Sequence, residues 1–149
     1  EIYTLSLHDA LPIYVNLFWT DVKGAVLKGA VVTSCRMNRV NLIGADISGA
    51  NFSQSNMIEA DLRNTDMTNA LFQSSNMNGS DLSRATMPGA DFTLAMIRDS
   101  MWIATDVRGA NFDQASLHRS DFTLAKWDDT TNFPKKFDPE NTGPKDVND

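Results

Sequence analysis

A large apolar residue occurs at every fifth position of this chain, without a gap, from Leu17 to Trp127. An α-helix repeats every 3.6 residues and a β-strand every 2, so neither element explains a period of five. Small residues (Ala, Ser, Thr, Cys or Val) occupy each multiple of five from Ala25 to Ala125, and the positions between are mostly polar. Each pentapeptide therefore offers one large and one small side chain to an interior.

Such a unit suits a square coil, in which each pentapeptide makes one short extended side and a corner. Four sides close a turn of about twenty residues, and the backbone then pairs with the coils above and below. Four phenylalanines lie twenty residues apart, which predicts that their rings stack, and three methionines form a second column. The main members of the predicted core ladder are Phe52, Phe72, Phe92, Phe112, Leu42, Leu62, Leu82, Trp102, Phe122, Met37, Met57 and Met77.

The corners of the predicted coil carry residues that tolerate a positive φ. Pro88 and Gly89 are a favoured pair for the two central residues of a type II turn. Glycine adopts a positive φ freely and asparagine tolerates it. One such corner column contains Gly29, Gly49, Asn69, Gly89 and Gly109.

The stretches GADISGANF, EADLRNTDM, GSDLSRATM and GANFDQASL resemble the pentapeptide-repeat protein family, whose unit is Ala-(Asp/Asn)-(Leu/Phe)-x-x. The resemblance covers residues 15–129 and implies an all-β fold, a right-handed quadrilateral parallel β-helix. The 115 residues would make about 5.75 coils, and a spacing of about 4.8 Å per coil gives a rod about 28 Å long.

Both ends of the chain depart from the repeat. Residues 1–13, EIYTLSLHDALPI, resemble the translation of a common short-read sequencing adapter, so we expect them to be an artefact. The predicted solenoid spans residues 14–129, and residues 130–149 are predicted to be a capping tail. With the true N-terminus expected to be missing, the compartment stays open between the cytoplasm, the thylakoid lumen and the periplasm.

A stacked coil leaves an open end, and prolines in the tail cannot donate to a backbone ladder. We therefore expect an irregular C-terminal cap built from Trp127, Phe133, Pro134, Phe137 and Pro139. The tail also resembles the ending of many cyanobacterial and plastid pentapeptide-repeat proteins. The matching residues are Trp127, Asp128, Thr131, Phe133, Pro134, Phe137, Asp138, Pro139 and Gly143.

No residue is predicted to carry catalysis, a cofactor or a metal ion. His118 follows an inward Leu117 and should point to solvent, while Cys35 fills a small inward slot and should be buried. The stacked Asp and Asn residues lack the glycine-rich pattern of calcium-binding β-rolls, so we expect them to hydrogen-bond the backbone at the corners. We therefore expect that the chain is not an enzyme.

A rod without a catalytic, cofactor or metal site is expected to act by binding, and outward apolar residues indicate where a partner would bind. Five of them define a candidate interaction patch, namely Leu94, Met96, Met101, Ile103 and Leu124. This favours a scaffold or protein–protein interaction module whose partner and oligomeric state the sequence does not identify. The net charge of −6 argues against direct nucleic-acid binding, and no apolar run is long enough to span a membrane.

The alternative function is a DNA mimic that binds a type II topoisomerase (gyrase) and confers quinolone protection, as some members of the family do. Such a mimic should present strongly acidic faces. Residues 15–129 hold 13 acidic and 10 basic residues, a net charge of 10 − 13 = −3, and arginines interrupt the negative field. The balance of charge therefore favours the interaction module.

Overall fold

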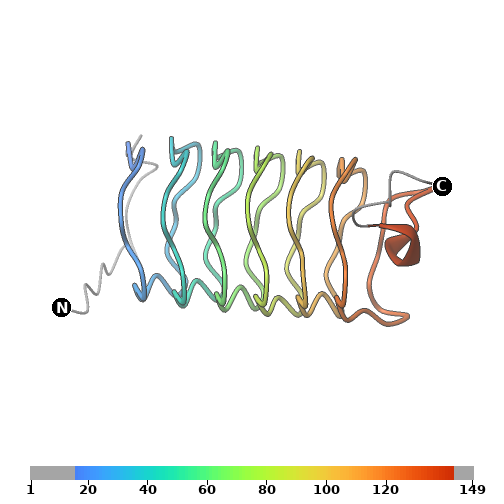
Figure 1. The fold of residues 1–149 in the computed structure, drawn as a ribbon. Helices are drawn as coiled ribbons and strands as arrows, with labels where there is room; N and C mark the ends of the chain where they lie inside the picture. Colours follow the sequence, from blue (N-terminus) through green and yellow to red (C-terminus); the bar gives the residue numbers. More distant parts are fainter. Residues whose placement is uncertain (1–15, 143–149) are drawn as a thin grey trace.

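The structure is a computed structural model that describes residues 16–142. The predicted adapter segment 1–13, residues 14 and 15 and the tail from Gly143 onward lie outside the described residues. Within the described range the chain winds into a row of stacked coils that ends near a short helix (Figure 1). That helix, η1, is a 3-10 helix over Pro139–Asn141.

Parallel bridges between successive coils hold the fold together. Every bridge but the last joins residues twenty apart, as in the series Asn51, Leu71 and Asp91. Phe72 N–H donates to the Asp91 carbonyl (2.7 Å), and Leu71 N–H donates to the Ala50 carbonyl (2.8 Å). Within residues 16–142 the pairing consists of isolated bridges, because a corner interrupts each side soon after its bridged residue.

The corners confirm and extend the predicted turns. Gly89 has a φ of +72°, and Ala90 N–H donates to the Met87 carbonyl (3.0 Å), which closes the Pro88–Gly89 turn. Every corner position from 19 to 124 has a positive φ, including Leu94 at +61°. A left-handed conformation costs about 1–2 kcal/mol for a residue with a Cβ, so the repeating architecture imposes the corner on residues that do not favour it.

Where Asp or Asn occupies a bridged position, its side chain stabilises the start of the corner that follows. The carboxylate of Asp81 accepts a hydrogen bond from Ser83 N–H (2.9 Å), and Asn51 accepts one in the same way from Ser53 N–H (3.0 Å). These bonds satisfy backbone donors that point away from the neighbouring coil. The stacked Asp and Asn residues therefore serve the corners, as the sequence predicts.

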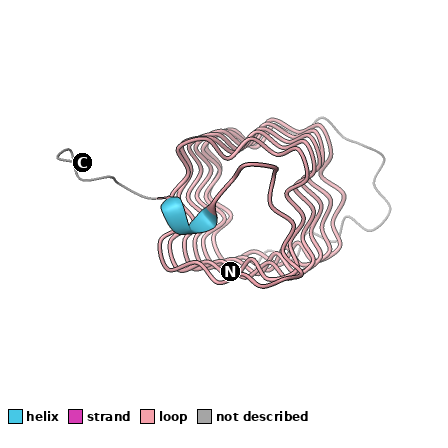
Figure 2. Cartoon of the chain, turned by 90° about the vertical axis from the view of Figure 1, so that its right-hand side faces the viewer, coloured by secondary structure: helices cyan, strands magenta, loops and turns pink. Residues whose placement is uncertain are grey.

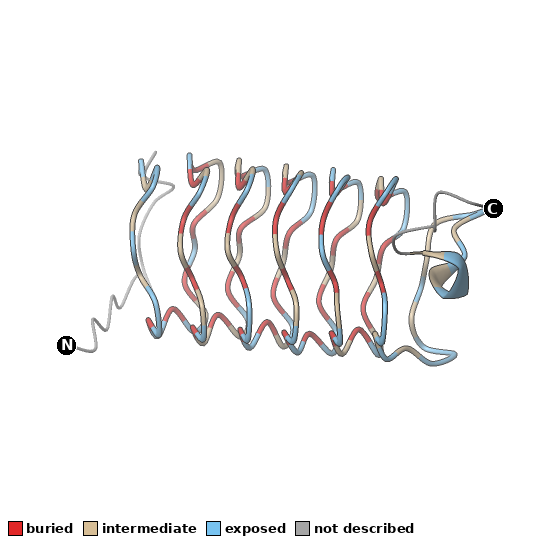
Figure 3. Cartoon of the chain, in the orientation of Figure 1, coloured by how far each residue is buried: buried red, intermediate tan, exposed pale blue. Residues whose placement is uncertain are grey.

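The core is a continuous column of apolar side chains inside the coils. The rings of Phe52, Phe72, Phe92 and Phe112 stack with centroid distances of 5.4, 5.0 and 5.1 Å, and Trp102 stacks on Phe122 at 5.0 Å. Every member of the predicted ladder is at most 1% exposed. Figure 3 shows the buried residues recurring along the coils and a more exposed coil at each end of the row.

The C-terminal end shifts the register by one residue. The last bridge joins Asn111 to Asn132, twenty-one residues apart, and the Phe133 ring stacks on Phe112 at 5.5 Å. The ladder thus continues past residue 129, where the sequence places the beginning of the tail. Beyond Pro134 the chain turns across the end of the solenoid toward η1 (Figure 2).

Candidate interaction surface

The five residues of the candidate interaction patch lie on the outside of the solenoid. Leu94 is 52% exposed, Met96 and Met101 are each 43% exposed, and Leu124 is 76% exposed. Ile103 is half-buried. Leu94 and Leu124 occupy corner positions with positive φ, and Met96 and Met101 occupy bridged positions on consecutive sides. Leu94, Met96, Met101 and Ile103 thus belong to the same coil, and Leu124 belongs to the next.

Polar residues flank the two methionines along the length of the solenoid. Met96 is bridged to Asn76 on one side and Ser116 on the other, while Met101 is bridged to Asp81 and Asp121. The apolar residues therefore follow the circumference of one coil instead of running down the rod. A partner that covers them must cross the rod's long axis.

A second group of exposed apolar residues lies on the first described coil, outside the predicted candidate interaction patch. Phe18 is 52% exposed and Trp19 is 71% exposed, and Val26 and Val31 are also exposed. The guanidinium of Arg39, one coil on, lies 5.7 Å from the centroid of the Trp19 ring. Phe18 and Trp19 occupy the two turn positions of their pentapeptide, and this place in the five-residue register is the signal that identifies them as outward residues.

Ion pairs neutralise much of the charge on the surface. Arg108 pairs with Asp106 at 2.6 Å, and Arg119 pairs with Asp99 of the preceding coil at 2.5 Å. The hydrogen bond from Arg108 holds the pKa of Asp106 below its usual value, and the hydrogen bond from Arg119 does the same for the pKa of Asp99. Both carboxylates stay ionised at neutral pH, and the guanidinium beside each one interrupts the acidic charge of the surface at these two places.

His118 and Cys35, the two side chains considered for a chemical role, lie where the sequence predicts. His118 is exposed, and Cys35 is buried, with its backbone N–H donating to the Ser55 hydroxyl (3.1 Å). Within residues 16–142, no group of three or more His, Cys, Asp or Glu side chains gathers in a way that could hold a metal ion. In the same range, no helix is both long and apolar enough to cross a membrane.

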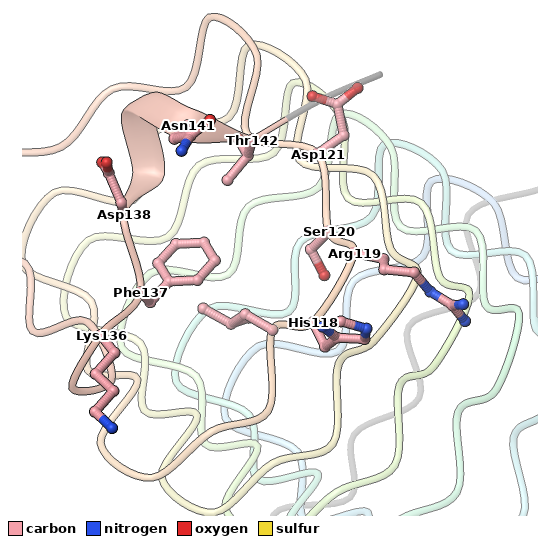
Figure 4. A pocket seen from close by; sticks show the side chains of 10 residues that line it. His118, Arg119, Ser120, Asp121, Lys136, Phe137, Asp138, Asn141 and Thr142 are labelled. Carbon is pink, nitrogen blue, oxygen red and sulfur yellow. The ribbon is translucent and has the colours of Figure 1, made fainter. Parts of the chain in front are cut away.

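The predicted cap residues contact the last coils through their aromatic rings. The Phe137 ring packs edge-on against Phe122 at 5.2 Å, and the Trp127 ring packs edge-on against Phe133 at 6.4 Å. Pro134 and Pro139 are half-buried. A cleft of about 690 Å³ lies between residues 117–121 and residues 136–138, and the Phe137 ring is part of its lining (Figure 4). The repeat pattern of the sequence does not predict this cleft.

Comparison with solved structures finds other solenoids. A pentapeptide repeat protein from the Arabidopsis thaliana thylakoid lumen is 24% identical, with a TM-score of 0.52 and 68% of each chain covered. One from the cyanobacterium Cyanothece 51142 is 22% identical over 70% of this chain and 64% of that chain, less than two thirds of its length, with a TM-score of 0.42. The plasmid-mediated fluoroquinolone resistance protein QnrB1 is 17% identical over 73% of this chain and 68% of that chain, with a TM-score of 0.45.

An identity of 24% shows that the Arabidopsis protein shares the fold of this chain, and it shows nothing about a shared function. No curated protein sequence matches the chain. The family model described as "Pentapeptide repeats" matches in eight copies, over residues 16–54, 35–73 and 66–100. Those segments span more than half of the chain and coincide with the bridged coils, so the chain belongs to the pentapeptide repeat family.

Proposed function

We propose that this chain is a non-enzymatic scaffold, a right-handed four-sided rod of about 5.75 coils that binds another protein through the candidate interaction patch. The observation that carries the proposal is the exposure of four large apolar side chains, at 43–76%, on two adjacent coils. Large apolar side chains gathered on an otherwise polar surface are typical of interaction sites.

The architecture supports the proposal because it fixes the backbone that carries those side chains. Met77 N–H donates to the Met96 carbonyl (2.7 Å), and Met101 N–H donates to the Ser80 carbonyl (3.0 Å). The backbone at both methionines is thus tied into the ladder, which fixes the spacing between their Cα atoms. A preorganised surface loses little conformational freedom when a partner binds.

The DNA-mimic alternative finds less support in the surface charge. A mimic of duplex DNA needs rows of unpaired acidic groups, whereas Asp61, Asp99 and Asp106 each pair with an arginine. The likeness to QnrB1, at a TM-score of 0.45, carries no argument about function. We therefore retain the interaction module as the proposal.

The test is the double variant Met101→Asp, Ile103→Lys, which places two charges in the patch. The matched control is Val31→Asp, Thr33→Lys, which makes the same changes at the same repeat positions three and a half coils away. Crosslinking in a lysate of the source organism, read by mass spectrometry, should identify a partner that the wild type and the control retain and the patch variant loses. Unchanged association of every crosslinked partner with the patch variant would refute the proposal.

A further inference from the structure

One side of the last complete coil is paired with the coil below, but its N–H groups that face the C-terminal end have no backbone partner within the described residues. In the coil below, Ile97 N–H donates to the Ser116 carbonyl (2.9 Å) and Asp99 N–H donates to the His118 carbonyl (3.0 Å). The equivalent donors one coil on, the N–H groups of Leu117 and Arg119, make no hydrogen bond within the described part of the chain. The side that begins at Leu117 is therefore an open β-edge with the donor spacing of the ladder.

A local turn in the C-terminal tail explains why this edge is open. Asn132 N–H donates to the Ala110 carbonyl (3.0 Å), and in the same register Phe137 N–H would donate to the Ala115 carbonyl. Phe137 N–H donates instead to the Pro134 carbonyl (3.0 Å), so the chain turns away before it reaches the Leu117 side. Among residues 16–142 the Ala115 carbonyl accepts no hydrogen bond.

The open edge lines the cleft described above. The cleft, with a volume of about 690 Å³, lies between residues 117–121 of the last coil and residues 136–138 and 141–142 of the tail. Such a volume is within the range of sites that bind small ligands and short peptides. The Phe137 ring faces the coil across the cleft and supplies an apolar wall (Figure 4).

The charges around the cleft are arranged along its length. Figure 4 shows Lys136 and His118 toward the end where both segments enter, and Asp138 and Asp121 toward the end where they leave. A peptide that ran parallel to the coil would place its first residues near Lys136 and its last residues near the two carboxylates. Complementary charge on such a peptide is acidic at the beginning and basic at the end.

We propose that this cleft binds an extended segment of another protein by parallel β-strand addition, with an acidic residue first, an apolar residue over Leu117 and a basic residue last. Two carbonyls of the segment accept from the N–H groups of Leu117 and Arg119, and one of its N–H groups donates to the Ala115 carbonyl. This inference rests on the proposed function in requiring a protein partner, but it uses residues outside the candidate interaction patch.

The test uses the full chain and the synthetic peptide Ac-Glu-Ala-Ser-Leu-Ser-Gly-Ser-Lys-NH2. Its glycine falls over Arg119, where the coil has a φ of +58°. Binding is followed by isothermal titration calorimetry and by the amide NMR signals of the protein. We expect saturable binding that shifts the Leu117 and Arg119 amide signals and slows their exchange with solvent.

Two comparisons make the expectation specific. The peptide with Glu and Lys interchanged should bind about tenfold more weakly, because two attractive charge contacts become repulsive. Lys136→Glu should weaken binding of the original peptide, whereas Lys135→Glu, a neighbouring exposed residue that does not line the cleft, should leave it unchanged.

Three results would overturn the proposal. They are absence of binding, binding without a change at Leu117 and Arg119, and amides at these residues that already exchange as slowly as those of Ile97 and Asp99 in the unbound protein. The last would show that the chain itself fills the edge. If the peptide does not bind but the double variant Met101→Asp, Ile103→Lys still loses its crosslinked partner, this inference is wrong and the proposed function is retained.

Discussion

The phenylalanine column gives the sharpest prediction about stability. Phe92 is fully buried, and its ring stacks between Phe72 at 5.0 Å and Phe112 at 5.1 Å. Trp102 packs edge-on against the same ring at 5.6 Å. Replacing Phe92 by alanine therefore removes a complete side chain from the interior together with three aromatic contacts.

The expected magnitude follows from those contacts. A buried Phe→Ala substitution costs about 3–5 kcal/mol, and each aromatic pair contributes about 0.5–1.5 kcal/mol beyond its burial. Because backbone ladders above and below fix the spacing of the coils, the cavity has little freedom to collapse. We expect Phe92→Ala to lower the free energy of unfolding by about 4–5 kcal/mol.

Urea unfolding followed by circular dichroism measures this loss, and the chain supplies a matched control. Phe18 is 52% exposed, so the same substitution there should change the free energy of unfolding by less than about 0.5 kcal/mol. Equal effects of Phe92→Ala and Phe18→Ala would refute the stacked interior.

Three further predictions test the corners, the carboxylates and the surface charge. Gly44 has a φ of +66° with nothing within 4 Å of an added Cβ, so Gly44→Ala should cost about 1–2 kcal/mol through backbone conformation alone; an unchanged urea midpoint would contradict this. Hydrogen bonds from Arg108 and Arg119 lower the pKa values of Asp106 and Asp99 in the folded state. Their stabilisation should therefore be complete above the unfolded pKa of about 3.9 and be lost as pH falls through the lower folded values. Thermal melts should show this decline below about pH 4, and a smaller decline for Asp106→Asn; equal declines would contradict the assignment. Purified protein should leave DNA supercoiling by gyrase unchanged, and dose-dependent inhibition would restore the DNA-mimic alternative.

The interior of this fold can be predicted from the sequence because a period of five leaves few options. The phenylalanine column and the Pro88–Gly89 turn both follow from spacing and turn chemistry. The positive φ of Leu94 could not be predicted from its own preference, because the ladder imposes that conformation on every corner from 19 to 124. Tertiary context here overrides residue propensity.

The C-terminal cleft could not be predicted from the same pattern. It depends on one extra residue between the Asn111 and Asn132 sides and on a local hydrogen bond from Phe137 N–H to Pro134. The aromatic spacing of the tail indicates a cap but does not show which side of the coil the cap leaves open. The members of the candidate interaction patch could be predicted from the sequence because the five-residue register fixes which positions point outward.

Site-specific photocrosslinking tests the central claim, that the chain acts through the apolar residues around one coil, most directly. A photoreactive phenylalanine analogue is placed at Met96, at Met101 and at Lys28, an exposed position several coils from the patch. The account predicts that one protein is captured at both methionine positions and is absent at Lys28. Capture of that protein equally from Lys28, or of no protein from either methionine position, would contradict it.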